Sequence, residues 1–397
     1  MGPLKDIRVL DLSRIMAGPW AGQILADLGA DVIKVERPGK GDDTRSWGPP
    51  FLKDTDGNET PDAGYYLAVN RGKRSIEVEL DTEEGQETIR RLAARSDIVL
   101  ENFKFGTLER YGLDYASLTR VKPDIIYCSI TGFGQTGPRR AEPAYDFLIQ
   151  AMGGLMSVTG EPDGAPGGGP QKVGIPIADI MTGMYAVIAV LAALSNRKQT
   201  GKGEYVDIAM LDVQASFLAN QAMNYLVSGR PPRRNGNAHP NIQPQDVYPV
   251  KDGHVVLVVG NDLQFARLAD LLGRPELASD PRFATNAERV RNVKELRPLL
   301  SELLGNHPMK DFLEACAKHG VPSGPINTIP MLFEDNQFLA RKMMVTQSHP
   351  TAGTVRTIAS PMKFTKNPLS FDRPPPLLGE HTAELSAEFG LGEATES

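Results

Sequence analysis

The sequence predicts an α/β fold in which a parallel, doubly wound sheet is accompanied by a smaller α+β domain. Two observations predict the sheet: a strand–helix–strand pattern opens the chain, and the same pattern recurs further on. A third predicts the smaller domain, because a hairpin pattern and three helical patterns stand apart in the second half. The length of 397 residues also favours more than one compact core.

The elements of the sheet are expected in the first third of the chain. They are a strand at Ile7–Leu12, a helix at Gly18–Leu28, strands at Asp31–Val35 and Ser75–Leu80, a helix at Glu83–Arg95, and strands at Asp97–Leu100 and Ile125–Ile130. The glycine-rich segment Thr131–Arg140 follows the last of these strands. Ligands of such sheets bind at the carboxyl ends of the strands.

The remaining elements begin with a buried helix and end with the smaller domain. They are a helix at Ile180–Leu194, a strand at Glu204–Ala209, a helix at Leu211–Val227, a linker at Ser228–Gln245, a hairpin at Asp246–Val259, helices near Leu263–Leu272, Val293–Leu304 and Met309–His319, and a closing helix from Glu380. The hairpin turns at Asp252-Gly253, and Asp246–Gly324 is expected to form the α+β domain.

Composition narrows the classes of partner. A net charge of -6 and a pI near 5.7 argue against nucleic acid, which favours a basic face. The apolar run Ile180–Leu194 is shorter than a bilayer requires, so no membrane is expected and the run is interpreted as a buried helix. Met1–Arg8 shows no signal peptide, which favours a cytoplasmic location, and Cys128 and Cys316 are expected to be reduced, buried thiols.

Two common classes of site lack their signatures. Glu36 ends the second strand where an acid would hold a ribose, but the turn after the first strand reads MAGPWAG rather than GxGxxG, and Pro19 lacks the N–H that a pyrophosphate would need. The six histidines are scattered, and no HExxH, GxSxG or paired CxxC occurs, so neither a metal centre nor a serine hydrolase is expected.

Basic residues gather near the predicted strand ends. They are Arg37, Arg71, Lys73, Arg74 and Arg110. Each one alone is typical of a solvated surface, but together they could surround a phosphorylated ligand.

Asp179 is the one charged residue of Val173–Asn196, directly before the apolar helix. One interpretation is a helix N-cap, which Asp favours. The other is a nucleophile or base in a poorly hydrated site. The residues alone therefore indicate an α/β enzyme that acts on a phosphate-bearing small molecule.

Several segments, in order, resemble the class III CoA-transferases of the formyl-CoA transferase type. They are Val9–Arg45 (VLDLSRIMAGPWAGQILADLGADVIKVERPGKGDDTR), Asn70–Leu80 (NRGKRSIEVEL), Glu101–Phe103 (ENF), Ser129–Pro138 (SITGFGQTGP), Tyr145–Gly160, Val173–Ala186 (VGIPIADIMTGMYA), Gly324–Thr328 (GPINT) and Pro374–Thr382 (PPPLLGEHT). The resemblance extends over nearly the whole chain.

The resemblance implies a Rossmann-like large domain built from residues 1–224 and 326–397, a small domain at 225–325, and a homodimer whose two chains interlock. It implies that Asp179 is the nucleophile, that no cofactor is permanently bound, and that acyl-CoA is a substrate. The positions that match the family's CoA contacts are Met16, Ala17, Arg37, Leu80, Asn102, Phe103 and Arg110, with Tyr145 near the thioester.

The likeness is nearest to the branch that moves CoA between succinate and dicarboxylates such as glutarate. Candidates for holding the second carboxylate are Arg233, Arg234, His239, Asn261 and Gln264, although linker solvation and a helix cap would explain them equally well. An α-methylacyl-CoA racemase of the same fold is the alternative, but it needs a histidine base where this chain has Tyr145. An NAD-dependent oxidoreductase is the alternative from another class.

Overall fold

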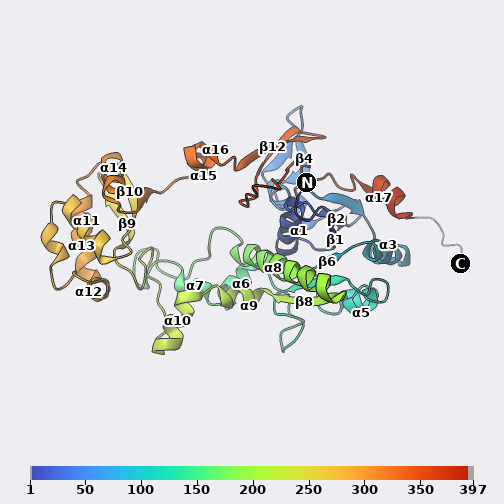
Figure 1. The fold of residues 1–397 in the computed structure, drawn as a ribbon, viewed down its shortest axis with the longest axis horizontal. Coiled ribbons are helices and arrows are strands. Elements are labelled where there is room, and N and C mark those ends of the chain that lie inside the picture. Colours follow the sequence, from blue (N-terminus) through green and yellow to red (C-terminus); the bar gives the residue numbers. More distant parts are fainter. Residues whose placement is uncertain (1, 392–397) are drawn as a thin grey trace. The chain divides into compact units, whose positions relative to one another are not determined.

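The structure is a computed structural model that describes residues 2–391. Its centre is a six-stranded parallel sheet with the order β5-β2-β1-β6-β7-β8 (Figure 1). The strands are β1 Arg8–Asp11, β2 Asp31–Glu36, β5 Arg74–Glu77, β6 Ile98–Glu101, β7 Ile126–Thr131 and β8 Glu204–Ala209. The strand order runs outward from β1 on one side and from β6 on the other, so the predicted doubly wound sheet is confirmed, with its switch point between β1 and β6.

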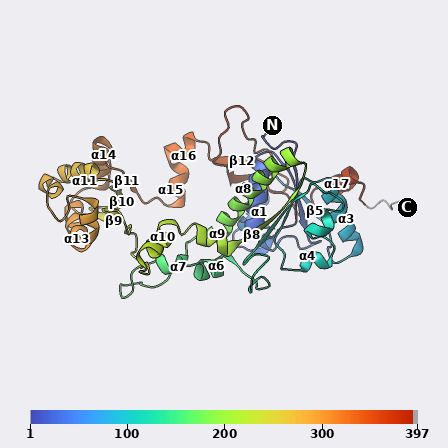
Figure 2. The same ribbon diagram turned by 60° about the horizontal axis from the view of Figure 1, so that its bottom comes forward.

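Helices cover both faces of this sheet. Successive strand residues point to opposite faces, and apolar residues on both faces need to be buried. On one face Val9 packs with residues of α1 (Ala17–Asp27) and α8 (Ile177–Thr200), and α1 lies beside α8 in Figure 2. On the other face Leu10 packs with α3 (Glu83–Ala94), α5 (Tyr115–Leu118) and α17 (Thr382–Phe389). The two apolar layers bury both faces of the sheet.

The chain divides into two compact units. The sheet unit contains the residues up to Leu155, Val173–Ala222 and the residues from Asn336 onward. The hairpin unit contains Met156–Lys172 and Met223–Asp335. The expected small domain at 225–325 is thus extended to Asp335 and joined by a segment from before α8 that the sequence analysis assigned to the large domain.

The hairpin unit has its own core. Strands β9 (Gln245–Val250), β10 (Gly253–Val258) and β11 (Ser323–Pro325) form an antiparallel sheet with the order β11-β10-β9. Its helices are α11 Asp262–Leu271, η2 Pro275–Ala278, α12 Asn286–Arg291, α13 Val293–Leu304, α14 Met309–His319 and α15 Ile329–Glu334. Cys316 belongs to this core and Cys128 to the sheet unit's core, and both thiols are buried and free, as expected.

Several short elements were not predicted, since elements of three to seven residues show little periodicity. They are η1 Asp43–Ser46, β3 Phe51–Lys53, β4 Glu59–Ala63, α2 Gly64–Leu67, α4 Thr107–Arg110, α6 Asp146–Met152, α7 Leu155–Val158, α16 Asn336–Ala340, β12 Met344–His349 and β13 Gly353–Ile358. The single helix expected at 211–227 is two, α9 Met210–Ser216 and α10 Ala219–Ser228, because Ala219 adopts a positive φ of 45°.

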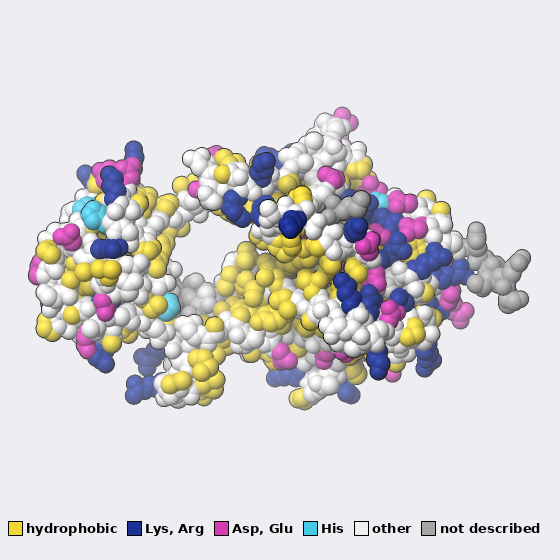
Figure 3. Space-filling model, in the orientation of Figure 1, with side chains coloured by type: hydrophobic (Ala, Val, Ile, Leu, Met, Phe, Trp, Pro, Cys, Tyr) yellow, Lys and Arg dark blue, Asp and Glu magenta, His cyan; other side chains and the backbone are white. Residues whose placement is uncertain are grey.

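Helix α8 is longer than the sequence analysis expected. It has 24 residues, and within residues 2–391 it is the one helix that length and composition would allow to cross a membrane. A core helix in a soluble protein would meet the same criterion. Within the most apolar 18-residue stretch of α8, 44% of the residues are buried. The exposed part includes Met184 and Ile188 and belongs to the apolar surface seen over α8 in Figure 3.

Candidate functional site

The carboxyl ends of the central strands enclose a pocket of about 270 Å³, here called the Arg37 pocket. Its lining includes Arg14, Arg37, Leu80, Phe103 and Tyr111. Arg37, Leu80 and Phe103 were all expected at a CoA site, and they come from three separate segments of the chain. The fold therefore brings these three together beside the switch point, where an open parallel sheet binds its ligands.

Asn102 joins the two sides of the switch point. Its Oδ1 accepts a hydrogen bond from Arg14 N at 2.8 Å, and its Nδ2 donates to Arg14 O at 2.7 Å. Ile15, which follows Arg14, adopts a left-handed φ of 74°, a strained conformation for a β-branched residue. Asn102 thus fixes the loop between β1 and α1 rather than standing free for a ligand.

Arg37 retains hydrogen-bonding capacity. Its guanidinium pairs with Asp43, but its Nε is buried and has no partner among residues 2–391. Arg110, in contrast, is exposed and does not line the Arg37 pocket, and its guanidinium lies 5.9 Å from the ring centre of Tyr111. Of the two expected phosphate ligands, Arg37 is the better placed.

The other basic residues expected around a phosphate are not available to it. Arg71, Lys73 and Arg74 are buried, and their nearest carboxylates belong to Asp27 at 2.6 Å, Asp11 at 2.8 Å and Asp31 at 2.6 Å. That part of the prediction is wrong. The positive charges near β5 balance buried carboxylates instead of facing a ligand.

Asp179 lies in the first turn of α8, not at its N-cap, which is Pro176. The N-cap interpretation is therefore wrong. The cap is supplied from α6 by Asp146, whose Oδ1 accepts from Ala178 N at 2.8 Å and from Asp179 N at 3.3 Å. Two carboxylates consequently share one helix N-terminus, where the peptide dipoles favour negative charge.

The Asp179 carboxylate is partly buried and has no ion pair among the residues described by the structure. Burial, with a smaller contribution from the negative charge of Asp146, raises the pKa of Asp179 to about 7. A carboxylate with this pKa is more basic than ordinary aspartate. It is a candidate nucleophile or base, as the second interpretation of the sequence held.

A close helix crossing places Asp179 near the start of α1. A Cβ on Gly183 would lie 2.5 Å from Ala17 O, so glycine is needed where α8 crosses α1. Asp179 is one helical turn before this crossing. Met16 and Ala17, both expected at the CoA site, are buried at the beginning of α1, on the same side of the sheet as Asp179.

Two aromatic residues of this site were missed. Burial and the negative charges of Asp179 and then Asp146 raise the pKa of Tyr65 to about 12, so both carboxylates act electrostatically on its hydroxyl. The ring of Tyr65 packs edge-on against Trp47 at 5.2 Å. No sequence signal separates Tyr65 from the adjacent Tyr66, which is buried beside Arg45 instead.

Gln150 holds the segment that precedes Asp179. Its Oε1 accepts from Val173 N at 2.9 Å, and its Nε2 donates to Asp146 Oδ2 at 2.6 Å. Tyr145, the expected site residue near the thioester, is the exposed N-cap residue of α6, directly before Asp146. The stretch 145–150 thus both carries Tyr145 and positions Asp146.

The residues expected to hold an acceptor carboxylate belong to the hairpin unit, and the observed contacts of His239, Asn261 and Gln264 are local. Asn261 caps α11 by accepting from Gln264 N at 2.9 Å, and Gln264 Oε1 accepts from Gly260 N at 2.7 Å. His239 Nδ1 accepts from Asn241 N at 3.1 Å. Within residues 2–391 no cluster of His, Cys, Asp and Glu is suited to hold a metal.

Comparison with known proteins relates this arrangement to one family. The family described as CoA-transferase family III matches residues 4–382. The chain is 51% identical to the succinate--glutarate CoA-transferase of Agrobacterium fabrum (99% of this chain, 97% of that protein) and 42% identical to the succinyl-CoA:glutarate CoA-transferase of Homo sapiens (97% and 86%). The crystal structure of a CAIB/BAIF family protein from Brucella suis is 52% identical, has a TM-score of 0.86, and covers 98% of this chain and 99% of its own. The chain therefore belongs to CoA-transferase family III.

Proposed function

We propose that the protein transfers CoA from succinyl-CoA to a dicarboxylate such as glutarate, with Asp179 as the covalent nucleophile. The observation that carries the proposal is the Asp179 carboxylate, partly buried, without an ion pair among residues 2–391, and held at a helix N-terminus. The relatives from Agrobacterium fabrum and Homo sapiens, which are named as succinate--glutarate and succinyl-CoA:glutarate CoA-transferases, support the choice of donor and acceptor.

The proposed reaction proceeds through four acyl transfers. Asp179 attacks the succinyl thioester, the C–S bond breaks, and an anhydride and CoA thiolate result. The thiolate attacks the aspartyl carbonyl, which releases succinate and leaves CoA attached to Asp179 as a thioester. The acceptor carboxylate then displaces the thiolate to form a second anhydride, and the thiolate attacks its acceptor carbonyl, which yields the new acyl-CoA and restores Asp179.

Three residues of the site have specific roles in this proposed reaction. The raised pKa strengthens Asp179 as a nucleophile, although only its ionised form attacks. Tyr65 stays protonated at neutral pH, so its hydroxyl is able to donate a hydrogen bond to a developing oxyanion. Arg37 and its pocket would hold the phosphates of CoA. A poorly hydrated site protects both anhydrides from hydrolysis.

The apolar surface around Asp179 supports a homodimer as the proposed assembly. On α6 and α8 the large exposed apolar or aromatic residues are Phe147, Leu148, Met152, Met184, Tyr185 and Ile188. Monomeric proteins rarely expose so continuous an apolar surface. We propose that a second copy covers it, in the interlocked manner that the family resemblance implies, and a monomeric mass by light scattering at micromolar protein would contradict this.

The covalent role of Asp179 is tested by trapping. Hydroxylamine added with succinyl-CoA is expected to convert the enzyme thioester into a hydroxamate at residue 179, detected by mass spectrometry of a digest. Asp179→Asn is expected to lose transfer by several orders of magnitude, since its amide oxygen forms no anhydride. Near-normal transfer by this variant, or a hydroxamate on another residue, would refute the assignment.

The racemase alternative is tested with the same two proteins. A 2-methylacyl-CoA incubated with wild-type enzyme in D₂O is expected to retain its α-proton, because Tyr145 is a poor base at neutral pH. Exchange of that proton by wild type but not by Asp179→Asn would favour the racemase.

A further inference from the structure

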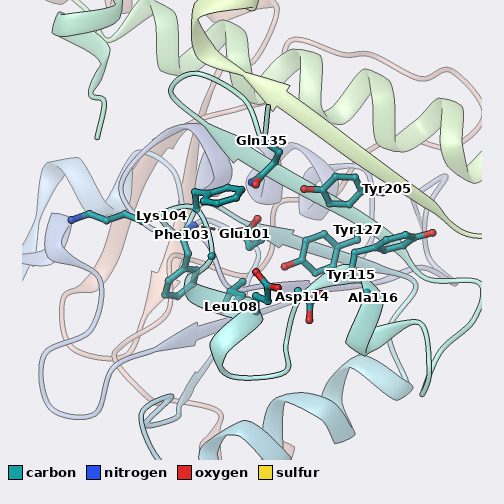
Figure 4. A pocket seen from close by; sticks show the side chains of 13 residues that line it. Glu101, Phe103, Lys104, Leu108, Asp114, Tyr115, Ala116, Tyr127, Gln135 and Tyr205 are labelled. Carbon is teal, nitrogen blue, oxygen red and sulfur yellow. Dashed lines mark hydrogen bonds between the residues drawn. The ribbon is translucent and has the colours of Figure 1, made fainter. Parts of the chain in front are cut away.

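A second pocket, of about 340 Å³, opens on the sheet face that carries α3 and α5 (Figure 4). We call it the Glu101 pocket, and its lining includes Glu101, Phe103, Asp114, Tyr127 and Tyr205. Only Phe103 and Lys104 also line the Arg37 pocket, so the two pockets lie on either side of this short segment. The proposed transfer reaction uses no other residue of the Glu101 pocket. Its volume is at the lower end of the range of about 300–1,000 Å³ typical of small-molecule sites.

The strand register explains why polar groups gather here. Glu101, the last residue of β6, is opposite Ser129 of β7, and Ser129 is opposite Asp207 of β8. Side chains in register share one face of the sheet, so two carboxyl groups and a hydroxyl lie along its carboxyl end. Gln135 Nε2 donates to Ser129 Oγ at 2.8 Å, and Gln135 N donates to Asp207 Oδ2 at 3.0 Å.

Glu101 is buried without a cation. The residue is 4% exposed, its Oε2 accepts from Phe103 N at 2.8 Å, and within the described part of the chain it has no ion pair. Most other buried carboxylates of the sheet unit are paired with a lysine or arginine. Burial chiefly, and the like charge of Asp207, raise the pKa of Glu101 to about 7. A buried carboxylate of this kind lacks its usual counter-charge.

The rest of the lining selects for positive charge. Glu109 and Asp114 add two acidic groups, whereas Lys104 is the one basic residue of the lining. Figure 4 shows the Lys104 ammonium directed away from the other side chains, while the head groups of Glu101, Gln135 and Tyr205 meet at one end. A field of this sign repels phosphate, so the pocket is unsuited to the nucleotide of CoA.

Aromatic rings make the other walls. Tyr115, Tyr127 and Tyr205 pack with ring centres 5.2 to 6.1 Å apart, and Phe103 and Phe105 add two further aromatic rings to the lining. Ring faces attract cations, and Phe105 already carries the Arg140 guanidinium 4.5 Å from its ring centre. An apolar body with one positive head group fits this combination.

We propose that the Glu101 pocket is a binding site for a small organic cation, an amine or amidine with an apolar body, whose charged group pairs with Glu101. Binding at this site is independent of the covalent role proposed for Asp179. Because Phe103 and Lys104 line both pockets, an occupant is placed to influence CoA binding through this segment.

Benzamidine and benzamide are matched probes, since they share size and shape and differ in charge. Isothermal titration of the wild-type protein at pH 8 is expected to show benzamidine binding with a Kd of about 1 mM or lower, and no measurable binding of benzamide. Glu101→Gln keeps the size of the side chain and an oxygen for Phe103 N, and it is expected to weaken benzamidine binding about tenfold or more. Asp179→Asn serves as the control that leaves the affinity unchanged.

A pH series separates Glu101 from its neighbours. Burial raises the pKa values of Tyr127, Tyr205 and Cys128, so these groups stay neutral, and Asp207 adds a negative charge on the same face of the sheet. Benzamidine affinity is therefore expected to fall about tenfold from pH 8 to pH 6, as Glu101 takes up a proton around its pKa of about 7. Equal binding of benzamide, no binding of benzamidine, or an affinity unchanged in folded Glu101→Gln would each overturn the proposal.

Discussion

Two regions of the sheet unit differ in how the charge of their carboxylates is balanced. At the ends of β1 and β2, Asp11 pairs with Lys73 and Asp42 with Lys34, each at 2.8 Å and fully buried. At the start of α8, Asp179 faces another carboxylate, Asp146, and no cation among residues 2–391. In the first region a lysine neutralises each carboxylate, whereas in the second region no cation among the described residues neutralises Asp179.

The consequences for protonation are opposite. Burial alone would raise the pKa of Asp42, but Lys34 and the hydrogen bonds from Thr44 outweigh it and lower the pKa to about 2. Nothing outweighs burial at Asp179, so its pKa rises to about 7. A fold keeps paired charges for structure, and it leaves charge unpaired where chemistry needs a reactive group.

The sharpest test of this contrast is a matched pair of isosteric substitutions. Asp11→Asn leaves Lys73 buried without its carboxylate and is expected to reduce the free energy of unfolding by about 3–5 kcal/mol. Asp179→Asn is expected to leave it unchanged or raise it, because it removes a carboxylate that the fold disfavours. Chemical denaturation of both variants at pH 8 measures the difference.

The sign of the second effect depends on pH. The folded pKa of Asp179 lies above the ordinary aspartate value of 3.8, so its ionisation destabilises the fold progressively from that value up to about pH 7. The increase in the free energy of unfolding of Asp179→Asn over wild type is expected to be largest above pH 7 and to disappear toward pH 4. A loss of stability at pH 8 would show that Asp179 has a structural partner after all.

Arg37 and Arg110 extend the comparison to cations. Arg37→Ala removes a pocket-lining guanidinium and is expected to weaken CoA binding by about 1–3 kcal/mol. Arg110→Ala is expected to have a smaller effect, because Arg110 is exposed and outside the lining. Titration calorimetry with CoA checks both, and equal losses would return Arg110 to the site.

Asp146→Asn tests the like charge itself. The amide oxygen is still able to accept from Ala178 N, so the cap of α8 is retained, whereas the amide nitrogen that replaces Oδ2 no longer accepts from Gln150 Nε2. The negative charge that raises the pKa of Asp179 is removed, and the acid limb of the kcat/KM profile is expected to move to lower pH by about one pH unit. A limb that stays in place would mean that burial alone sets this pKa.

The sequence predicted the architecture well because the strands and long helices have strong periodicity. It also located Asp179, whose isolation before an apolar run is visible in the sequence. It misjudged Arg71, Lys73 and Arg74, since the carboxylates that neutralise them come from Asp27, Asp11 and Asp31, more than forty positions away.

The capping of α8 was misjudged for the same reason. Asp146 lies 32 residues before Ala178, the residue whose N–H it accepts, and no local pattern joins them. Tyr65 was missed because its neighbour Tyr66 is the same residue type in the opposite environment. Local patterns predict elements, whereas pairing between distant residues requires the fold.

Tyr65→Phe is expected to give the smallest effect and tests the region around Asp179. The substitution retains the ring that packs on Trp47 at 5.2 Å and removes only the hydroxyl near Asp179 and Asp146. A hydrogen bond from this hydroxyl to a developing oxyanion would assist each acyl transfer, so kcat is expected to fall by up to about tenfold, with the KM for succinyl-CoA nearly unchanged. Steady-state kinetics of the variant checks this prediction.

Tyr66→Phe is unsuitable as a control, because the wild-type Tyr66 hydroxyl accepts a hydrogen bond from Arg45 Nη2 at 2.6 Å. Trp47→Phe is the better control, since it perturbs the same ring contact and leaves the Tyr65 hydroxyl in place. An unchanged kcat in Tyr65→Phe, or an equal loss in Trp47→Phe, would assign Tyr65 a packing role and leave Asp179 without a hydroxyl partner in the reaction.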